Sequence, residues 1–414
     1  MDALVSSTLL TPRYLMKVIE DIPTQIETYR GNDVFPLVTQ PGPKIEWDVK
    51  RPLGGMTQAV ARGAESPVIH RRGVGQASFE PAHFREKVIL GESDVTTLRK
   101  LGTWEQRSTA AELIAEIMID LNDRLETRIE WMRWQPIVNN QIVISSNLVQ
   151  YTVSYNMPSR QRPTAGTLWS STSTANPISD IQTWIRLARG TGGRVKKFWF
   201  NSKVEQYLFQ NSRILSLIDR VFNSGDVGVM SRKILGSILK TYIGDYEYEV
   251  YDGGYLAVSY TTAAVAAATA AHSVVVDDAS SFTAGDVCQL SASDESAEEN
   301  VTIDSISGNT ITCVSSTLAG TYPAASMLRC YKTYIPDTKF IIELEFPAGS
   351  GPKGEVVSVD AVYGSGSLMN PVPGKFAETL FMDKDPKQIE IITGINALPV
   401  LYRKRGFIVA AVAA

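Results

Sequence analysis

The stretch "KRPLGGMTQAVARGAESPVIHRRGVGQASFEP", residues 50–81, reads as one loop that is very long for a compact protein. Connections beyond about 12 to 15 residues without secondary structure are uncommon, and ordering each residue costs roughly 1 to 2 kcal/mol of backbone entropy. Contacts outside the segment must therefore hold it in place. The segment is basic in an acidic chain: its charged residues up to position 76 are Lys50, Arg51, Arg62, Glu65, Arg71 and Arg72.

The flanks of this stretch predict a β-hairpin. Before it, Ile45, Trp47 and Val49 alternate with charged residues, which is the period of a half-exposed strand. After it, "FREKVIL" at residues 84–90 predicts a returning strand. We therefore expect residues 50–81 to form the tip of a very long hairpin.

A long amphipathic helix is predicted next. Thr103 and Gln106 have the spacing of a capping box, and an apolar stripe then continues to Pro136, which indicates about 30 residues or roughly 45 Å of helix. The stripe consists of Ile114, Ile117, Met118, Leu121, Leu125, Ile129 and Met132. Charged residues largely off the stripe are predicted to face solvent, with Asp120 and Arg124 spaced to pair. They are Glu112, Glu116, Asp120, Arg124, Glu126 and Arg133.

The following sequence mixes helical and strand-like patterns, which predicts an α+β protein. Strand-like segments are 136–155, 194–201 and 338–346, and helical segments are 178–190 and 203–219. In the last strand, "TKFIIELEF", Glu343 and Glu345 occupy alternate positions and are predicted to lie on its solvated side.

Residues 257–335 differ in composition from their surroundings. They are rich in Ala, Ser, Thr and Val, contain several strand candidates and carry the hairpin signal "ISGNTI". After Pro336 the composition is again like that of the segments before residue 257. This pattern predicts a small all-β module inserted into a host domain.

Composition limits the possible functions. The 414 residues carry a formal net charge of -4, which argues against a dedicated nucleic-acid binder, so any DNA contact should be non-specific. No apolar run reaches the roughly 20 residues needed to span a bilayer, and the first ten residues do not resemble a signal peptide. We expect a cytosolic protein, with Cys288, Cys313 and Cys330 as free thiols because they lack metal-site spacing.

The sequence offers little that could support catalysis. His70, His83 and His272 are the only histidines, and none has the spacing of a known catalytic or metal-binding motif. "GTGGRVKK" at residues 190–197 lacks the phosphate-loop pattern and lies between a helix and a strand, the reverse of the required order. We therefore predict no catalytic residues, no metal site, no cofactor and no enzymatic activity.

Four features together resemble the major capsid proteins of tailed bacteriophages, of the phage lambda E type. They are the basic loop on a long hairpin, the long helix, the passage "YTVSYNMPSRQRPTAGTLWSSTSTANPISDIQTWI" at 151–185 and the passage "NPVPGKFAETLFMDKDPKQIEIITGINALPVLYR" at 370–403. The resemblance covers most of the chain apart from residues 257–335.

The resemblance implies the Hong Kong 97 capsid fold, with seven expected regions. These are an N-terminal arm at 1–35, an extended loop at 36–95, a peripheral domain with a spine helix at 96–180, an axial domain at 181–256, an inserted all-β module at 257–335, the rest of the axial domain at 336–370, and C-terminal strands completing the peripheral domain at 371–414.

The resemblance also implies the function of a major head protein that self-assembles into an icosahedral shell around double-stranded DNA and matures from a procapsid. Expected partners are copies of itself in hexamers and pentamers, scaffolding and portal proteins, a decoration protein, and DNA without sequence preference, with no membrane. The expected location is the virion capsid, and the host cytoplasm during assembly. The extended loop would lie across a neighbouring subunit, so its charged residues are the candidate subunit-interface residues.

Two other functions remain open from the residues alone. One is a carbohydrate- or receptor-binding surface protein that acts through the 257–335 module. The other is a hydrolase with an unrecognised site. Electron microscopy of the expressed protein separates these functions, since only a shell protein forms shells or tubes.

Overall fold

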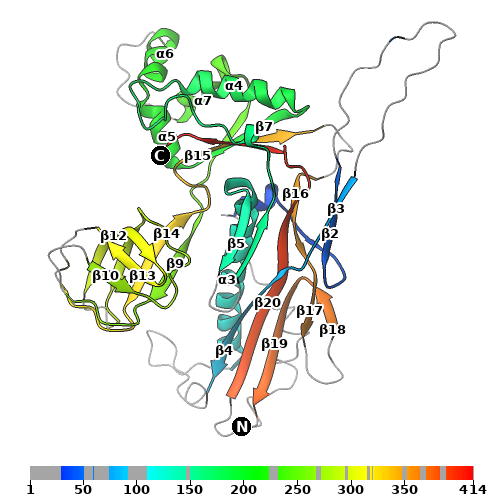
Figure 1. Ribbon diagram of the computed structural model, residues 1–414, viewed down its shortest axis with the longest axis vertical. Helices are drawn as coiled ribbons and strands as arrows, with labels where there is room; N and C mark the ends of the chain where they lie inside the picture. Colours follow the sequence, from blue (N-terminus) through cyan, green and yellow to red (C-terminus); the bar gives the residue numbers. More distant parts are fainter. Residues whose placement is uncertain are drawn as a thin grey trace. The chain divides into compact units, whose positions relative to one another are not determined.

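The computed structural model describes residues 29–50, 59, 74–91, 110–145, 150–222, 232–266, 272–293, 297–314, 318, 320–346, 352–363, 370–382 and 388–413 (Figure 1). Most of the predicted N-terminal arm and of the hairpin tip lies outside this set. Helices and sheets are both extensive in the described residues, so the predicted α+β class is confirmed. None of the helices described is long and apolar enough to cross a membrane.

The chain forms two compact units, each assembled from segments that are distant in the sequence. Unit 1 comprises residues 1–136 and 347–406, and unit 2 comprises residues 137–346 and 407–414. These bounds differ from the expected peripheral and axial domains because strands pair across the expected boundaries. The strand β16 (Gly354–Ser358) belongs to a sheet of unit 1, and β21 (Phe407–Ala411) belongs to a sheet of unit 2.

A five-stranded sheet organises unit 1 around the long strand β20 (Gln388–Leu401), which is almost entirely buried. The other strands are β4 (Ala82–Leu90), β19 (Lys375–Met382) and β16, all antiparallel to β20, and β1 (Leu37–Thr39), parallel to β16. Figure 1 shows β4, β20 and β19 side by side. A separate pair joins β17 (Asp360–Tyr363) to β18 (Asn370–Pro373).

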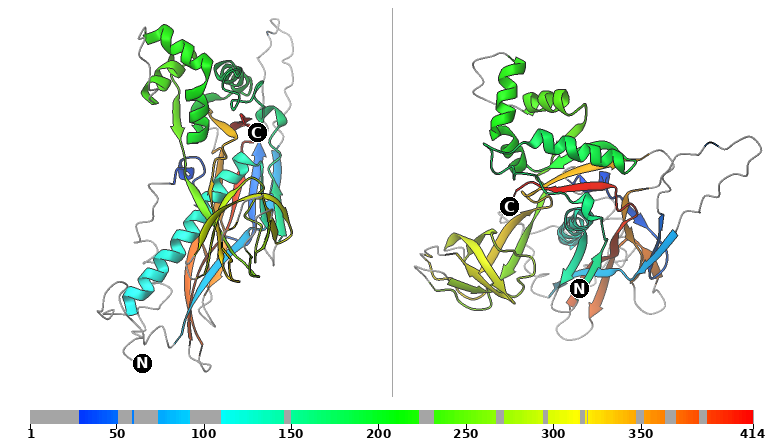
Figure 2. Two further views of the ribbon diagram at one scale, coloured as in Figure 1. Left: turned by 90° about the vertical axis from the view of Figure 1, so that its left-hand side faces the viewer. Right: turned by 45° about the horizontal axis from the view of Figure 1, so that its top comes forward.

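The predicted long helix is α3 (Ala110–Val138), seen along its length in the left view of Figure 2. Its apolar stripe packs on the sheet of unit 1 through a cluster of Leu90, Ile114, Met118, Leu121, Ala377 and Ile391. The predicted stop at Pro136 is wrong, because the helix continues to Val138. A proline removes one backbone donor and crowds the preceding turn, and here only the last turn of the helix is affected.

The predicted hairpin has a different second strand. The first strand, β2 (Ile45–Lys50), pairs antiparallel with β3 (Val74–Phe79), whereas the predicted returning strand lies in β4 and pairs with β20. Pro81 separates β3 from β4 and cannot donate to a ladder, so the chain changes sheet there. The segment between β2 and β3 therefore comprises residues 51–73, nearly all of which lie outside the described residues.

Unit 2 contains a four-stranded mixed sheet covered by helices. The strands, in order, are β21, β15 (Lys339–Glu345), β7 (Arg194–Phe200) and β8 (Glu247–Val250). The helices are α4 (Pro177–Gly190), α5 (Ser202–Gln210), α6 (Ser212–Phe222) and α7 (Arg232–Tyr242). A hairpin of β5 (Gln141–Ser145) and β6 (Gln150–Ser154) precedes the 3-10 helix η3 (Ser159–Gln161).

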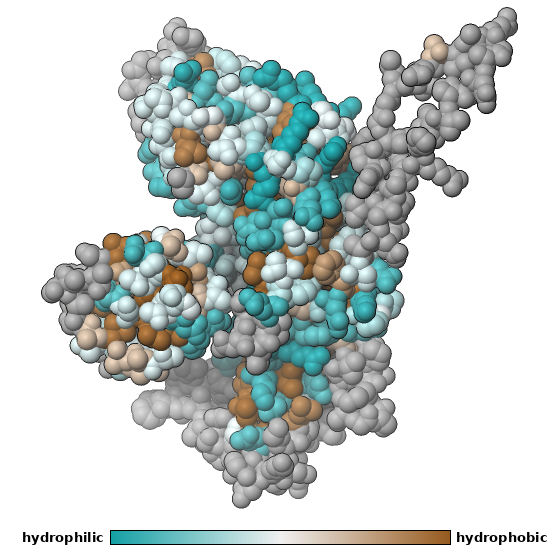
Figure 3. All heavy atoms as spheres, viewed as in Figure 1, coloured by the Kyte–Doolittle hydropathy of each residue, from teal (hydrophilic) through white to brown (hydrophobic). Residues whose placement is uncertain are grey.

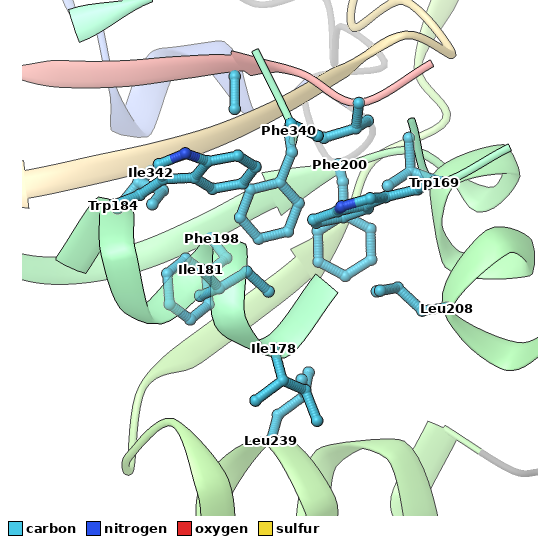
Figure 4. Packing of buried hydrophobic residues seen from close by; sticks show 14 of the residues in the cluster. Trp169, Ile178, Ile181, Trp184, Phe198, Phe200, Leu208, Leu239, Phe340 and Ile342 are labelled. Atoms are coloured by element: carbon cyan, nitrogen blue, oxygen red, sulfur yellow. The ribbon is translucent and has the colours of Figure 1, made fainter. Parts of the chain in front are cut away.

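Aromatic rings form the centre of the unit 2 core (Figure 4). The Phe340 ring lies 5.2 Å from the ring of Trp169, 5.4 Å from Phe200, 5.5 Å from Phe198 and 6.0 Å from Trp184, centroid to centroid. Ring pairs at such separations stabilise a core beyond their buried area. This packing joins β15, β7, α4 and the segment before α4.

The predicted single helix at 203–219 is two helices. Asn211 interrupts it: the side-chain oxygen accepts hydrogen bonds from the backbone N–H groups of Arg213 and Ile214, at 3.1 and 3.2 Å. An asparagine that caps the next helix in this way ends the preceding one. The interruption therefore separates α5 from α6.

A six-stranded antiparallel sheet lies within unit 2 and has its own core. Its strands, in order, are β10 (His272–Val275), β13 (Thr310–Cys313), β12 (Glu298–Ser307), β11 (Val287–Ser291), β14 (Met327–Thr333) and β9 (Gly254–Tyr260). We call residues 254–333 the β module. Its three cysteines are free and buried.

Glu343 contradicts the prediction that it lies on the solvated side of its strand. Its side chain is fully buried, and its two carboxylate oxygens accept hydrogen bonds from Lys196 Nζ at 3.0 Å and from Trp199 Nε1 at 2.9 Å. Both faces of β15 are covered by other parts of the protein. Alternate residues of this strand therefore do not face solvent. Glu345, at the end of the strand, is exposed as predicted.

Candidate assembly interface

The structure describes the stem of the predicted interface loop. Lys50 ends β2, with its backbone opposite Val74 of β3. The other candidate interface residues, Arg51, Arg62, Glu65, Arg71 and Arg72, lie outside the described residues, as does the side chain of Lys50. Their role at a subunit interface remains a prediction.

The base of this stem is anchored by apolar contacts. Ile45 is fully buried, and Trp47 stacks on Phe79 with ring centroids 5.8 Å apart. Because the stem has only two strands, its register needs such cross-strand contacts. The base of the hairpin therefore belongs to the folded subunit.

A buried carboxylate connects α3 to the segment that precedes the hairpin. Glu130 on α3 is fully buried. Its Oε1 atom accepts hydrogen bonds from the Gly31 backbone N–H and from Trp134 Nε1, both at 2.8 Å, while Oε2 accepts one from Arg133 Nη1 at 3.0 Å. One charge is thus compensated by an adjacent cation and two neutral donors.

Arg133 extends this network along the N-terminal segment. Its Nε atom donates to the backbone oxygen of Phe35 at 3.0 Å, and its Nη2 atom donates to Asn32 Oδ1 at 3.0 Å. Gly31 is required at the closest point, because a Cβ atom there would lie 2.6 Å from Glu130 Oε2. We call Gly31, Asn32, Phe35, Glu130, Arg133 and Trp134 the Glu130 network.

The exposed-face prediction for α3 holds for some charged residues and fails for others. Glu116 and Asp120 are exposed, whereas Glu126 and Arg133 are buried. Glu126 forms an ion pair with Lys375 of β19. Arg124, predicted to pair with Asp120, donates from Nε and Nη2 to the two carboxylate oxygens of Glu86 on β4, at 2.5 and 3.0 Å. These contacts connect α3 to the sheet of unit 1.

The carboxyl groups of α3 also affect one another. Partial burial, together with the charges of Asp120 and Glu126, raises the pKa of Asp123 above its ordinary value. Crowded carboxylates disfavour the ionised form. This part of the helix therefore binds protons more readily than isolated aspartates would.

A basic groove lies in unit 2 between α4 and the segment around η3. It has a volume of about 660 Å³ and is lined by Ser159, Arg160, Pro163, Thr164, Gly166, Asp180, Thr183, Trp184, Arg186 and Leu187. Arg160 and Arg186 are exposed and form no ion pair with any described residue. Asp180, the acidic residue of the lining, accepts a hydrogen bond from Trp169 Nε1 at 3.0 Å. The groove thus presents two arginines available to an anionic partner.

The β module is acidic and exposes apolar side chains. Residues 254–333 contain eight acidic and two basic residues, a net charge of -6 in a chain whose total is -4. Exposed apolar residues lie on the strands β9, β11 and β14, and Figure 3 shows brown atoms over the module. They include Leu256, Val258, Tyr260, Val287 and Tyr331.

The sequence reasoning missed the Glu130 network and the basic groove. Trp134 follows Glu130 by four positions, and this helical spacing was a usable signal for a contact between them. For the groove, the signal was charge, since residues 159–197 hold seven basic residues and one acidic residue. No local pattern could indicate that Gly31 lies against Glu130.

Comparison with known proteins identifies a family for most of the chain. The chain matches the family of phage major capsid protein E over residues 11–292. No curated protein sequence matches significantly. Among solved structures, a prophage protein of E. coli CFT073 described as its capsid protein is 13% identical with a TM-score of 0.52, over 98% of this chain and 99% of that one. The capsid of cyanophage A-1(L) is 11% identical with a TM-score of 0.43, over 95% and 94%.

Proposed function

This chain belongs to the phage major capsid protein E family, and on that premise we propose how its hairpin, basic groove and β module serve the shell of a tailed phage. Membership establishes a shell-forming head protein of the virion capsid with a Hong Kong 97-like fold. The alternative of a carbohydrate- or receptor-binding surface protein has no support from the comparisons. The family is structural, and our proposal contains no catalytic step.

The hairpin would act between subunits. The folded subunit anchors its base through Ile45 and the Trp47–Phe79 stack, whereas the basic loop beyond β2 and β3 needs an external surface to hold it. A neighbouring subunit within a hexamer or pentamer supplies such a surface. Electron microscopy of the expressed protein tests this assembly: closed shells or tubes support it, and small discrete particles under all conditions contradict it.

A head protein would also bind other proteins of the phage. Assembly in the host cytoplasm would involve scaffolding and portal proteins, and a decoration protein would bind the finished shell. The exposed apolar residues of the β module are suited to such a protein contact. We expect the acidic β module to lie on the outer surface of the shell, because its negative charge and that of the enclosed DNA repel each other.

Non-specific DNA contact would use the basic groove. Replacing Arg160 and Arg186 by Ser should weaken DNA binding by the free subunit about equally for all sequences. The slope of log K against log salt should fall by about 1 for each lost phosphate contact, or about 2 in total. Binding titrations at several salt concentrations measure this slope.

The matched control replaces Arg213 and Lys233 by Ser. Both are exposed cations of unit 2 outside the groove, so the net charge changes equally. An equal loss of affinity in this control would show that only net charge matters, and would remove the groove from the proposal. A sequence preference of the native subunit would contradict non-specific contact.

The remainder of the subunit should fold without the β module. Its ends meet, since Gly254 of β9 pairs with Thr333 of β14 and Tyr334 N donates to Gly253 O at 2.9 Å. Joining such close ends with a short Gly/Ser linker in place of 254–333 costs little loop-closure entropy. We expect a soluble subunit that keeps a cooperative unfolding transition, measured by circular dichroism. Loss of that transition would mean that the module is part of the host core.

A further inference from the structure

Two of the three buried cysteines of the β module face each other across neighbouring strands. In the antiparallel pair β11–β14, Gln289 lies opposite Arg329 and Leu290 lies opposite Leu328. Continuing this register by one residue brings Cys288 opposite Cys330. Both side chains point to the core face, where Cys288 is fully buried and Cys330 is 4% exposed.

This placement suits a disulfide. Directly opposed residues of an antiparallel pair have Cα atoms about 4.5 to 5.5 Å apart, which lies within the range of about 4.4 to 6.8 Å found for disulfides. The Cys330 Sγ atom also lies 3.5 Å from the backbone oxygen of Val287, the residue before Cys288. The interaction between the two thiols raises the pKa of Cys288 and lowers the pKa of Cys330.

The third cysteine is excluded by the strand order. Cys313 lies on β13, which is separated from β11 by β12, and from β14 by β12 and β11. On β13, Cys313 instead lies opposite His272 of β10 and Ile303 of β12, so it is the cross-strand partner of neither Cys288 nor Cys330. Burial also raises the pKa of Cys313 to about 11, which keeps it protonated.

We propose that Cys288 and Cys330 form a cross-strand disulfide in the β module when the protein meets a peroxide after leaving the reducing host cytoplasm. Hydrogen peroxide, which is small and uncharged, is the oxidant. The cross-link itself rests on the geometry of β11 and β14. Only its timing rests on the proposed assembly in the host.

The reaction proceeds in two balanced steps. The Cys330 thiolate attacks one peroxide oxygen, so an S–O bond forms, the O–O bond breaks, and the released hydroxide takes a proton to become water. The Cys288 sulfur then attacks the Cys330 sulfur, so the S–S bond forms and the S–O bond breaks. The leaving hydroxide accepts the Cys288 proton as a second water. Two thiols are oxidised and one peroxide is reduced.

Peptide mapping tests the proposal on the full-length protein. After treatment with hydrogen peroxide and blocking of the remaining thiols, trypsin cleaves after Arg329 and separates Cys330 from the peptide that holds Cys288 and Cys313. We expect a linked peptide pair, lighter by two hydrogen atoms than the separate peptides and released by reductant. The number of free thiols in denatured protein should fall from three to one.

Variants identify the partner and control for folding. Cys313→Ala removes a thiol from the same core and should keep the link, whereas Cys288→Ala should abolish it. The oxidised native protein should also melt at a higher temperature than the reduced protein, because the disulfide closes a long loop of the unfolded chain. A link between Cys330 and Cys313, three thiols remaining after oxidation, or a lower melting temperature would each overturn the proposal.

Discussion

Reversing Arg62, Arg71 and Arg72 to Glu is expected to yield a soluble, folded subunit that no longer forms shells. The three changes take the formal net charge of the chain from -4 to -10. If the basic loop meets an acidic surface of a neighbour, each attraction becomes a repulsion at every copy of the interface. One exposed pair contributes only about 0.2 to 1 kcal/mol, but the loss recurs throughout a closed symmetric array.

The failure should be most severe at low salt, where repulsion between exposed charges is least screened. Electron microscopy and sedimentation measure shell formation, and thermal melting measures the fold. The matched control reverses Lys203, Arg213 and Lys233 of unit 2, which are exposed. Normal shells from the loop variant would remove the loop from the assembly mechanism. An unfolded variant subunit would instead place the loop in the subunit's own core.

Replacing Glu130 by Ala should produce the largest loss of stability among single substitutions in α3. The change leaves the buried Arg133 without its carboxylate and removes the acceptor of Gly31 N and Trp134 Nε1. Removing one partner of a buried ion pair typically costs about 3 to 5 kcal/mol. The free energy of unfolding, obtained from denaturant titrations followed by circular dichroism, measures this loss.

Two further variants make the measurement decisive. Asp120→Ala removes a carboxylate from the exposed face of the same helix and should change the free energy of unfolding by only about 0.5 kcal/mol. Glu130→Gln keeps one oxygen acceptor and should destabilise less than Glu130→Ala, so it gives a value even if the alanine variant does not fold. Equal small effects for all three substitutions would mean that the Glu130 network does not stabilise the subunit.

The sequence predicted those elements whose signal is local. The apolar stripe of α3 and the alternation of β2 follow from residues close together in the chain, and both elements are present, although α3 continues to Val138. The cap at Asn211 is also a local signal, but the helical pattern on either side of it is stronger and conceals the break. The strand that pairs with β2 was assigned incorrectly, because β3 and β4 are both strand-like and only the remote β20 determines the partner of β4.

Burial of charged residues was predicted least well. Alternation assumes that one side of an element faces water, and this assumption fails for Glu343 because both faces of β15 are covered. The matching expectation for α3 fails for Arg133, because the backbone oxygen of Phe35, 98 residues nearer the N-terminus, accepts a hydrogen bond from its side chain. The groove arginines, Arg160 and Arg186, likewise come from separate elements. Such sites depend on contacts between segments that are distant in the sequence. The hydrophobic periodicity of a single segment does not show these contacts.

The pairing of β20 has a mechanical consequence. Residues 389–395 of this strand are hydrogen-bonded to β4 on one side and to β19 on the other. A pull along the strand axis must break many of these bonds at once, in shear, rather than one after another as in unzipping. Such a strand resists tension that acts along its own axis. The sheet of unit 1 therefore has the geometry of a stiff, force-resistant element.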